Sequence, residues 1–139
     1  MRILGVDLGD RRIGLAVADT DARVAAPVDA IDRAGGADAC EAVAEAARAR
    51  GADAVVVGLP LLMSGVEGAQ AREAREFATL LAERTGLLVH TWDERLSSVE
   101  AERLLREAGG RRKPKPGEQD AMAAALILQA YLDAHPRLP

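Results

Sequence analysis

The chain has 139 residues, of which 49% are hydrophobic and 29% are charged, a composition within the ordinary range of globular proteins. Its formal net charge of −4 argues against a protein that coats nucleic acid through its overall charge. Phe77, Trp92 and Tyr131 are its only phenylalanine, tryptophan and tyrosine. This scarcity argues against a binding mode that stacks many bases on aromatic rings.

Length and cysteine content indicate one globular domain over residues 1–139. A chain of this size is long enough to bury a core. Cys40 is the only cysteine, so no intramolecular disulfide is expected. The first residues lack the layout of a signal peptide, and no apolar run is long enough to span a bilayer. We therefore expect a cytoplasmic protein without a membrane partner.

Apolar runs with strand character alternate with helical patterns along the chain. Runs bounded by turn residues predict five strands, over Met1–Leu8, Ile13–Ala18, Val24–Ile31, Ala54–Gly58 and Leu87–Trp92. Helical periodicity and capping residues predict helices over Asp38–Arg50, from the end of the Leu59–Gly68 loop to about Arg84, over Ser97–Ala108 and over Glu118–Ala134.

Local signals add detail to this outline. Pro27 in the third strand suits a sheet edge or a bulge. Asp38 and Glu41 have the spacing of a capping box, and Gly86 stands just beyond the expected end of the second helix. The apolar side of that helix is predicted to contain Phe77, Leu80 and Leu81.

The order of these elements is β-β-β-α-β-α-β-α-α. Three strands in succession pair as antiparallel hairpins, whereas each later strand follows a helix and joins the sheet through a crossover. The predicted fold class is therefore α/β, with a five-stranded mixed sheet of three antiparallel strands and two βα units, and helices on both faces.

Acidic residues stand where three of these elements begin or end. Asp7 lies near the end of the first strand in an apolar run, where a charged carboxylate needs a partner. Asp93 and Glu94 follow the last strand, and ligands gather at the carboxyl ends of strands in such sheets. Asp120 opens the last helix on the face that also carries Ile127. Spacing alone does not choose between Asp93 and Glu94.

Acids that gather in one place repel one another unless a cation lies between them. Mg²⁺ or Mn²⁺ prefers carboxylate, water and phosphate oxygens, and two such ions activate water for attack on a phosphodiester. The basic loop Arg111–Gly117 precedes Asp120 and would hold the backbone of a polyanionic substrate. The combination predicts a metal-dependent nuclease.

Each feature also has a purely structural interpretation. Asp120 would complement the dipole of its helix, and Asp7 would cap the turn that follows it. Asp93 and Glu94 would form a loop ion pair with Arg95, and the basic loop would be a solvated tether. The nuclease hypothesis therefore depends on the combination of features rather than on any one of them.

Four blocks of the sequence resemble the YqgF/RuvX family: GVDLGDRRIGLAV, VVGLPLLMSGVEG, WDERLSSVEAERLL and DAMAAALILQAYL. They occur in family order and span nearly the whole chain. The resemblance implies an RNase H-like fold in a bacterial protein that is Holliday-junction resolvase-like or that matures the ends of pre-16S ribosomal RNA. It implies Mg²⁺ or Mn²⁺ as cofactor, RNA or DNA and ribosomal precursor particles as partners, and a monomer or homodimer.

The resemblance also assigns site residues. Asp7, Glu94 and Asp120 match the family's acids and are expected to be catalytic and to bind the metal, with Asp93 in reserve. The expected substrate-binding residues, as phosphate contacts, are Arg11, Arg12, Arg95, Arg111, Arg112, Lys113 and Lys115. The middle block departs from the family pattern at Leu62, Ser64 and Val66, which replace polar residues.

Two other functions stay open at this point. Asp7, Gly9 and Gly14 also resemble the phosphate loop of sugar kinases and actin-like ATPases, but those proteins close two such domains around the nucleotide and this chain has the length of one. The other alternative is a non-catalytic module that binds ribosomal RNA or the ribosome. A mildly acidic protein with few aromatic residues makes a poor passive RNA binder.

Overall fold

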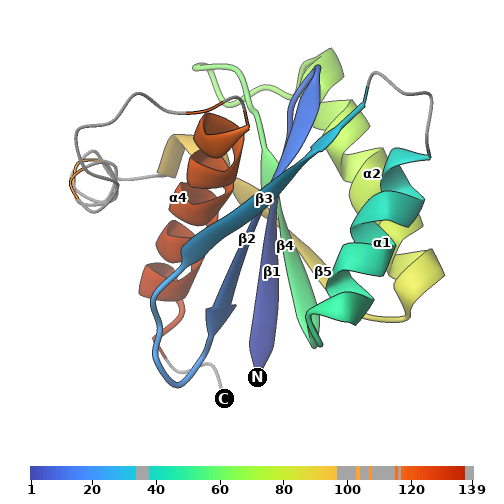
Figure 1. Cartoon of the computed structure of the whole chain (residues 1–139). Helices are drawn as coiled ribbons and strands as arrows, with labels where there is room; N and C mark the ends of the chain where they lie inside the picture. Colours follow the sequence, from blue (N-terminus) through green and yellow to red (C-terminus); the bar gives the residue numbers. More distant parts are fainter. Residues whose placement is uncertain (34–37, 97–102, 104–106, 108–114, 116, 137–139) are drawn as a thin grey trace.

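The computed structural model describes residues 1–33, 38–96, 103, 107, 115 and 117–136. They form a five-stranded sheet in the order β3-β2-β1-β4-β5, with helices on both faces (Figure 1). This architecture confirms the predicted mixed α/β fold. The predicted helix over Ser97–Ala108 and the basic loop over Arg111–Gly117 lie mostly outside the described residues.

An antiparallel meander forms one half of the sheet. β1 (Arg2–Leu8) pairs with β2 (Arg12–Asp19), and β2 pairs with β3 (Ala26–Asp32). β3 is an edge strand, and the register shifts beside Ala16, which lies opposite Pro27. Proline cannot donate a ladder hydrogen bond, so both the edge position and the bulge match the prediction for Pro27.

Parallel strands form the other half. β4 (Ala54–Leu59) and β5 (Leu88–Asp93) extend the sheet beyond β1, and all three run in the same direction. α1 (Ala39–Ala49) precedes β4, and α2 (Ala69–Thr85) connects β4 to β5. Because the three strands are parallel, their carboxyl ends meet at one edge of the sheet, which we call the carboxyl edge.

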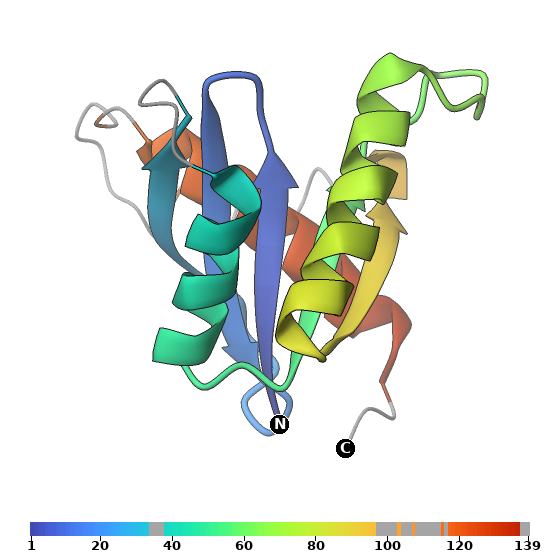
Figure 2. The same ribbon diagram turned by 90° about the vertical axis from the view of Figure 1, so that its right-hand side faces the viewer.

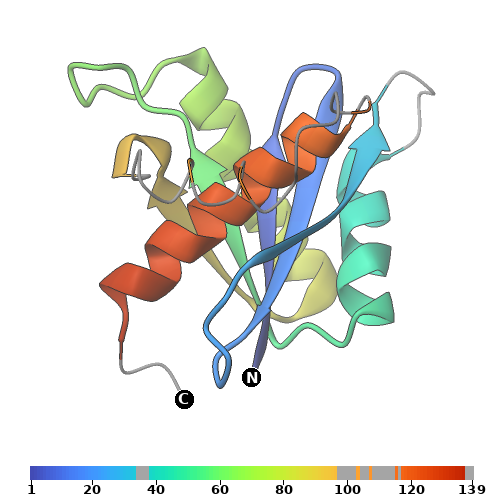
Figure 3. The same cartoon turned by 60° about the vertical axis from the view of Figure 1, so that its left-hand side comes forward.

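Two apolar layers hold the helices to the sheet. α1 and α2 cover one face and α4 (Glu118–Ala134) crosses the other (Figures 2 and 3). The residues that α4 buries are Ala121, Ala124, Ala125, Ile127, Leu128, Tyr131 and Leu132. Alanine side chains are short, so the first half of this helix lies close to the strands.

Burial in α2 follows a different stripe from the predicted one. Its buried residues are Ala71, Ala74, Ala78 and Leu81, and Phe77 packs beside them. Leu80 is 39% exposed, so its predicted place on the apolar side is wrong. The small residues at spacings of three and four positions define the buried face, and Leu80 points away from it.

The predicted helix ends are confirmed for α1 and α2. The side chain of Asp38 accepts a hydrogen bond from the backbone N–H of Glu41 at 3.2 Å, as an N-cap residue does. α2 ends at Gly86, which has the left-handed φ of 72°. Among the described helices, none is both long enough and apolar enough to cross a membrane.

Candidate active site

Asp7 is the next-to-last residue of β1 and lies on the face that α4 covers. A Cβ built at Gly5 would lie 2.9 Å from the Cβ of Leu128 in α4. Side chains two positions apart in a strand lie on the same face, so Asp7 also faces α4. It is half-buried, at the carboxyl edge where the sequence analysis expects it.

Gly14 brings Asp120 to the side of Asp7. Gly14 is the cross-strand partner of Asp7. A Cβ at Gly14 would lie only 1.9 Å from the backbone oxygen of Asp120, so Asp120 lies next to the strand pair that carries Asp7. No larger residue leaves room for the start of α4 there. The Asp120 carboxylate lies beside the turn at Gly9 and is 3.6 Å from Nη1 of Arg12.

Glu94 reaches the same region from the other side of β4. It begins the short 3-10 helix η1 (Glu94–Leu96), directly after β5. A Cβ at Gly58 of β4 would lie 2.6 Å from Oε1 of Glu94, so the carboxyl group occupies space that a side chain would fill. β4 separates β5 from β1, and across this gap Glu94 forms a side-chain hydrogen bond with Asp7.

The contact between Asp7 and Glu94 favours a protonated carboxyl group at this site. Two carboxyl groups form a hydrogen bond with each other only when one of them is protonated. Burial, reinforced by the negative charge of Asp7, raises the pKa of Glu94 to about 7, so Glu94 is the donor. Burial also raises the pKa of Asp7, and repulsion from Asp120 adds to that rise. The hydrogen bond with Glu94 acts in the opposite direction and lowers the pKa of Asp7.

Asp93 has a different partner. Its carboxylate accepts a hydrogen bond from the backbone N–H of Arg95 at 3.0 Å and forms an ion pair with Nη2 of Arg95 at 2.7 Å. The hydrogen bond from Arg95 is the main reason that the pKa of Asp93 lies below its ordinary value. The loop ion pair considered in the sequence analysis is therefore present at Asp93, and Glu94 is the acid that faces Asp7.

The chemistry of Asp7, Glu94 and Asp120 fits a divalent cation, because all three offer oxygen ligands and repel one another without a counter-charge. Among the residues that the structure describes, no three acidic, histidine or cysteine side chains already surround one ion position. A cation would take the place of the proton between Asp7 and Glu94. Asp120 would complete the ligand set if its contact with Arg12 were replaced by a contact with the cation.

The predicted basic residues divide into two groups. Arg11 is exposed at the β1–β2 turn, Arg12 contacts Asp120, Arg95 is bonded to Asp93, and Lys115 is exposed just before α4. Three arginines therefore lie at the carboxyl edge around the acids. The other predicted phosphate contacts, Arg111, Arg112 and Lys113, lie outside the described residues.

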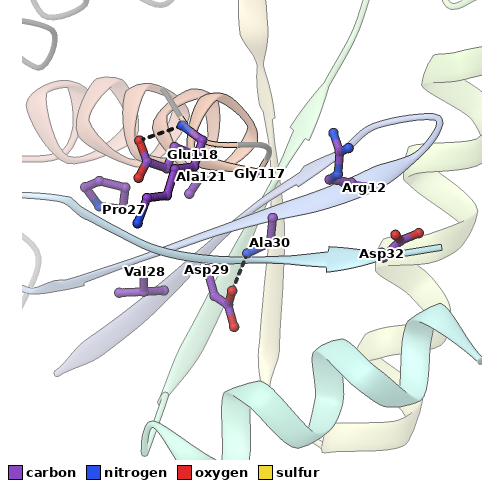
Figure 4. Close-up of a pocket in the computed structure, with 10 residues that line it drawn as sticks. Arg12, Pro27, Val28, Asp29, Ala30, Asp32, Gly117, Glu118 and Ala121 are labelled. Atoms are coloured by element: carbon purple, nitrogen blue, oxygen red, sulfur yellow. Dashed lines mark hydrogen bonds between the residues drawn. The ribbon is translucent and has the colours of Figure 1, made fainter. Parts of the chain in front are cut away.

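A cavity of about 490 Å³ opens between β3 and the start of α4 (Figure 4). Arg12 lines this cavity together with Ala30, Gly117 and Ala121. The side chain of Arg12 therefore borders open space and has room to move away from the Asp120 carboxylate.

Arg33 is a further basic residue of this edge, and it is not among the predicted phosphate contacts. Its Nη1 donates to the backbone oxygen of Gly9 at 2.6 Å, and its Nη2 lies 3.0 Å from Glu73. It lines a second cavity at the β1–β2 turn together with Arg11 and Arg12. The hairpin register, which pairs Arg12 with the residue before Arg33, is the signal that would have identified it.

Comparisons with known proteins find relatives that match nearly the whole chain. The profile of the family described as "RuvX: Holliday junction resolvase" matches residues 1–134. A protein of Anaeromyxobacter dehalogenans (strain 2CP-C) named "Putative pre-16S rRNA nuclease" is 52% identical over 133 residues, which cover 96% of this chain and 97% of the relative. A protein of Chloroflexus aurantiacus (strain ATCC 29366 / DSM 635 / J-10-fl) with the same name is 43% identical over 132 residues, which cover 95% of this chain and 86% of the relative.

The fold likeness extends to solved structures. Thermus thermophilus RuvC matches with a TM-score of 0.64 at 19% sequence identity, over 96% of this chain and 96% of that chain. The likeness confirms the RNase H-like fold that the resemblance implies.

Proposed function

We propose that this chain, which belongs to the RuvX Holliday junction resolvase family, is a nuclease that hydrolyses phosphodiester bonds in nucleic acid with the help of a divalent metal ion. The observation that carries the proposal is the gathering of three acids at the carboxyl edge. The start of α4 at Asp120 lies against Gly14, the cross-strand partner of Asp7. The Glu94 carboxyl group lies over Gly58 and interacts with Asp7. Half-buried acids that repel one another destabilise a fold, and such clusters concentrate at functional sites.

Asp7, Glu94 and Asp120 would hold Mg²⁺ or Mn²⁺. When bound, the ions supply positive charge that activates the attacking water and stabilises the leaving oxygen. Asp7 interacts with both other acids, so it is the ligand that two ions would share. Glu94 and Asp120 would be the flanking ligands, and Glu94 would release its proton as the ion binds.

Arginines at the carboxyl edge would hold the substrate. Arg11, Arg12 and Arg95 lie around the acids, and arginine binds phosphate oxygens through paired N–H groups. Arg12 would pass from Asp120 to a substrate phosphate when a cation takes its place. Lys115, Arg111, Arg112 and Lys113 would extend these backbone contacts.

The relatives' names suggest the natural substrate. Proteins 52% and 43% identical to this chain are named for action on pre-16S ribosomal RNA, whereas the family description names four-way DNA junctions. We therefore propose that the chain acts on the ends of precursor ribosomal RNA, within ribosomal precursor particles, and take DNA junctions as the second candidate substrate.

The test is the Asp7→Asn variant, which removes the central charge and keeps the size of the side chain. We expect cleavage to fall by at least about a thousandfold, because the shared ligand is lost. Nucleic-acid binding should persist or tighten, since one negative charge no longer repels the phosphates. Cleavage and binding are measured on labelled single-stranded RNA, paired RNA and a four-way DNA junction, each with Mg²⁺ and with Mn²⁺.

Asp21→Asn is the matched control. Asp21 is exposed and follows β2, which places it at the opposite end of the sheet, so this variant should cleave like the unchanged protein. Full activity of Asp7→Asn would remove the proposal.

A further inference from the structure

The loop between β4 and α2 carries an exposed apolar tip, formed by Leu62, Met63 and Val66. Their exposed fractions are 55%, 91% and 58%. Among the described residues, five large apolar side chains are at least 55% exposed. Three of these five lie in this one short turn, so their exposure is a local feature. Single exposed apolar residues need no explanation, but a cluster does.

The loop backbone holds this tip out in an ordered turn. The N–H of Gly65 donates to the oxygen of Leu62 at 2.7 Å, and the N–H of Leu62 donates to the oxygen of Val66 at 3.1 Å. Gly65 has the left-handed φ of 87°, as three-residue hairpin loops require at this place. The hydrogen-bonded turn therefore presents Met63 to solvent.

The apolar tip is linked directly to the candidate active site. Nη1 of Arg95 donates to the backbone oxygen of Met63 at 3.3 Å, while Nη2 holds Asp93 at 2.7 Å. Asp93 immediately precedes Glu94. The loop follows the carboxyl end of β4 and stands out from the body of the molecule at the carboxyl edge (Figures 2 and 3).

We infer that the apolar tip inserts between unpaired bases of the nucleic acid whose backbone lies across the acids, so that cleavage occurs beside a single-stranded or unpaired stretch. This inference rests on the proposed nuclease function and defines its substrate more narrowly. Phosphates held by the arginines and acids leave the attached bases exposed next to this edge. Apolar side chains such as leucine and methionine unstack bases by wedging between them.

Aliphatic residues have this role here because the aromatic residues are engaged elsewhere. Phe77 packs against the layer under α1 and α2, and Trp92 and Tyr131 belong to the layer under α4. A protein partner is a poorer match for the tip. Specific protein interfaces bury roughly 800 Å² on each side, and three side chains on a narrow turn beside a guanidinium group supply only a small part of that area.

The experiment measures binding without cleavage, in the Asp7→Asn background. The probes are two RNA oligonucleotides of one sequence with 2-aminopurine at the same position, one single-stranded and one fully paired. We expect tighter binding of the single strand and a rise in 2-aminopurine fluorescence as the base loses its stacked neighbours. Adding Met63→Ser should weaken single-strand binding by about tenfold and abolish the fluorescence rise.

Two further variants separate base contact from a general effect on the fold. Met63→Leu keeps an apolar side chain at the tip and should restore both signals. Val24→Ser makes the same kind of change at a residue that is 66% exposed on the loop between β2 and β3, and should alter neither signal. Circular dichroism melting of each variant establishes that it is folded.

The outcomes distinguish this inference from the proposed function. Equal affinity of Asp7→Asn with and without Met63→Ser, or equal affinity for single-stranded and paired RNA, would overturn the inference alone. Failure of the unchanged protein to cleave these RNAs and a four-way DNA junction with Mg²⁺ or Mn²⁺ would instead overturn the proposed function.

Discussion

At the scale of single residues, Glu94 retains a proton that it would lose in the unfolded chain. An exposed glutamate has a pKa of about 4.3, whereas burial and the charge of Asp7 raise the pKa of Glu94 to about 7. The fold therefore binds this proton more tightly than the unfolded chain does. Between the two pKa values the unfolded chain releases this proton while the folded chain keeps it, so raising the pH favours the unfolded chain.

A dependence of stability on pH follows from this difference. In metal-free buffer we expect the free energy of unfolding to fall by about 1–2 kcal/mol between pH 5 and pH 7.5. This change is smaller than the full pKa difference would give, because solvent still reaches the Glu94 carboxyl group. Urea unfolding at a series of pH values measures it. Glu94→Gln cannot titrate and still donates to Asp7, so its stability should fall less. An equally steep fall in that variant would contradict the assignment.

At the scale of elements, two glycines determine how closely the acids approach one another. A side chain at Gly14 would collide with the backbone of Asp120, and one at Gly58 would collide with Glu94 and Ile127. The start of α4 can approach β2, and the residue after β5 can approach β4, only because glycine leaves no side chain at these two positions. Close packing allows no relaxation where the obstacle is main chain rather than a flexible side chain.

Gly14→Ala should consequently lower the free energy of unfolding by about 3 kcal/mol, because its Cβ would lie 1.9 Å from the Asp120 backbone oxygen. Gly68→Ala is the control, since its Cβ would make an ordinary contact at 3.7 Å with Leu62, and should cost less than about 1 kcal/mol. Chemical denaturation of both variants measures the difference. A Gly14→Ala protein as stable as Gly68→Ala would show that α4 does not begin where the structure places it.

Element bounds and element contacts differ in how far the sequence predicts them. Strand periodicity and caps such as Asp38 are local properties, so the described elements lie close to their predicted ranges. The prediction for Leu80 is wrong because the identity of the buried stripe depends on the shape of the sheet beneath it. Arg33 and Gly58 acquire their roles only through strand register, which pairs residues distant in the chain and leaves no local pattern.

At the scale of the whole molecule, the strand order brings the acids together. β4 lies between β1 and β5, and the three are parallel, so Asp7 and Glu94 lie at the same edge even though their strands are not neighbours. α4 crosses one face and places Asp120 at that edge. The net charge of −4 then makes nucleic-acid binding depend on the arginines concentrated there rather than on the molecule as a whole.

This arrangement makes stability sensitive to divalent metal. An ion that binds the folded chain at about 100 times its dissociation constant stabilises it by about 2.7 kcal/mol, which for a domain of this size raises the melting temperature by roughly 6–10 °C. Melting curves with Mn²⁺ and with chelator measure the shift, which Asp21→Asn should retain in full and Asp7→Asn should largely lose. An equal shift in Asp7→Asn would mean that the ion binds elsewhere. Since the ion takes the place of a proton, the shift should also grow as the pH rises through about 7, whereas adventitious binding to exposed carboxylates would already be complete well below that pH.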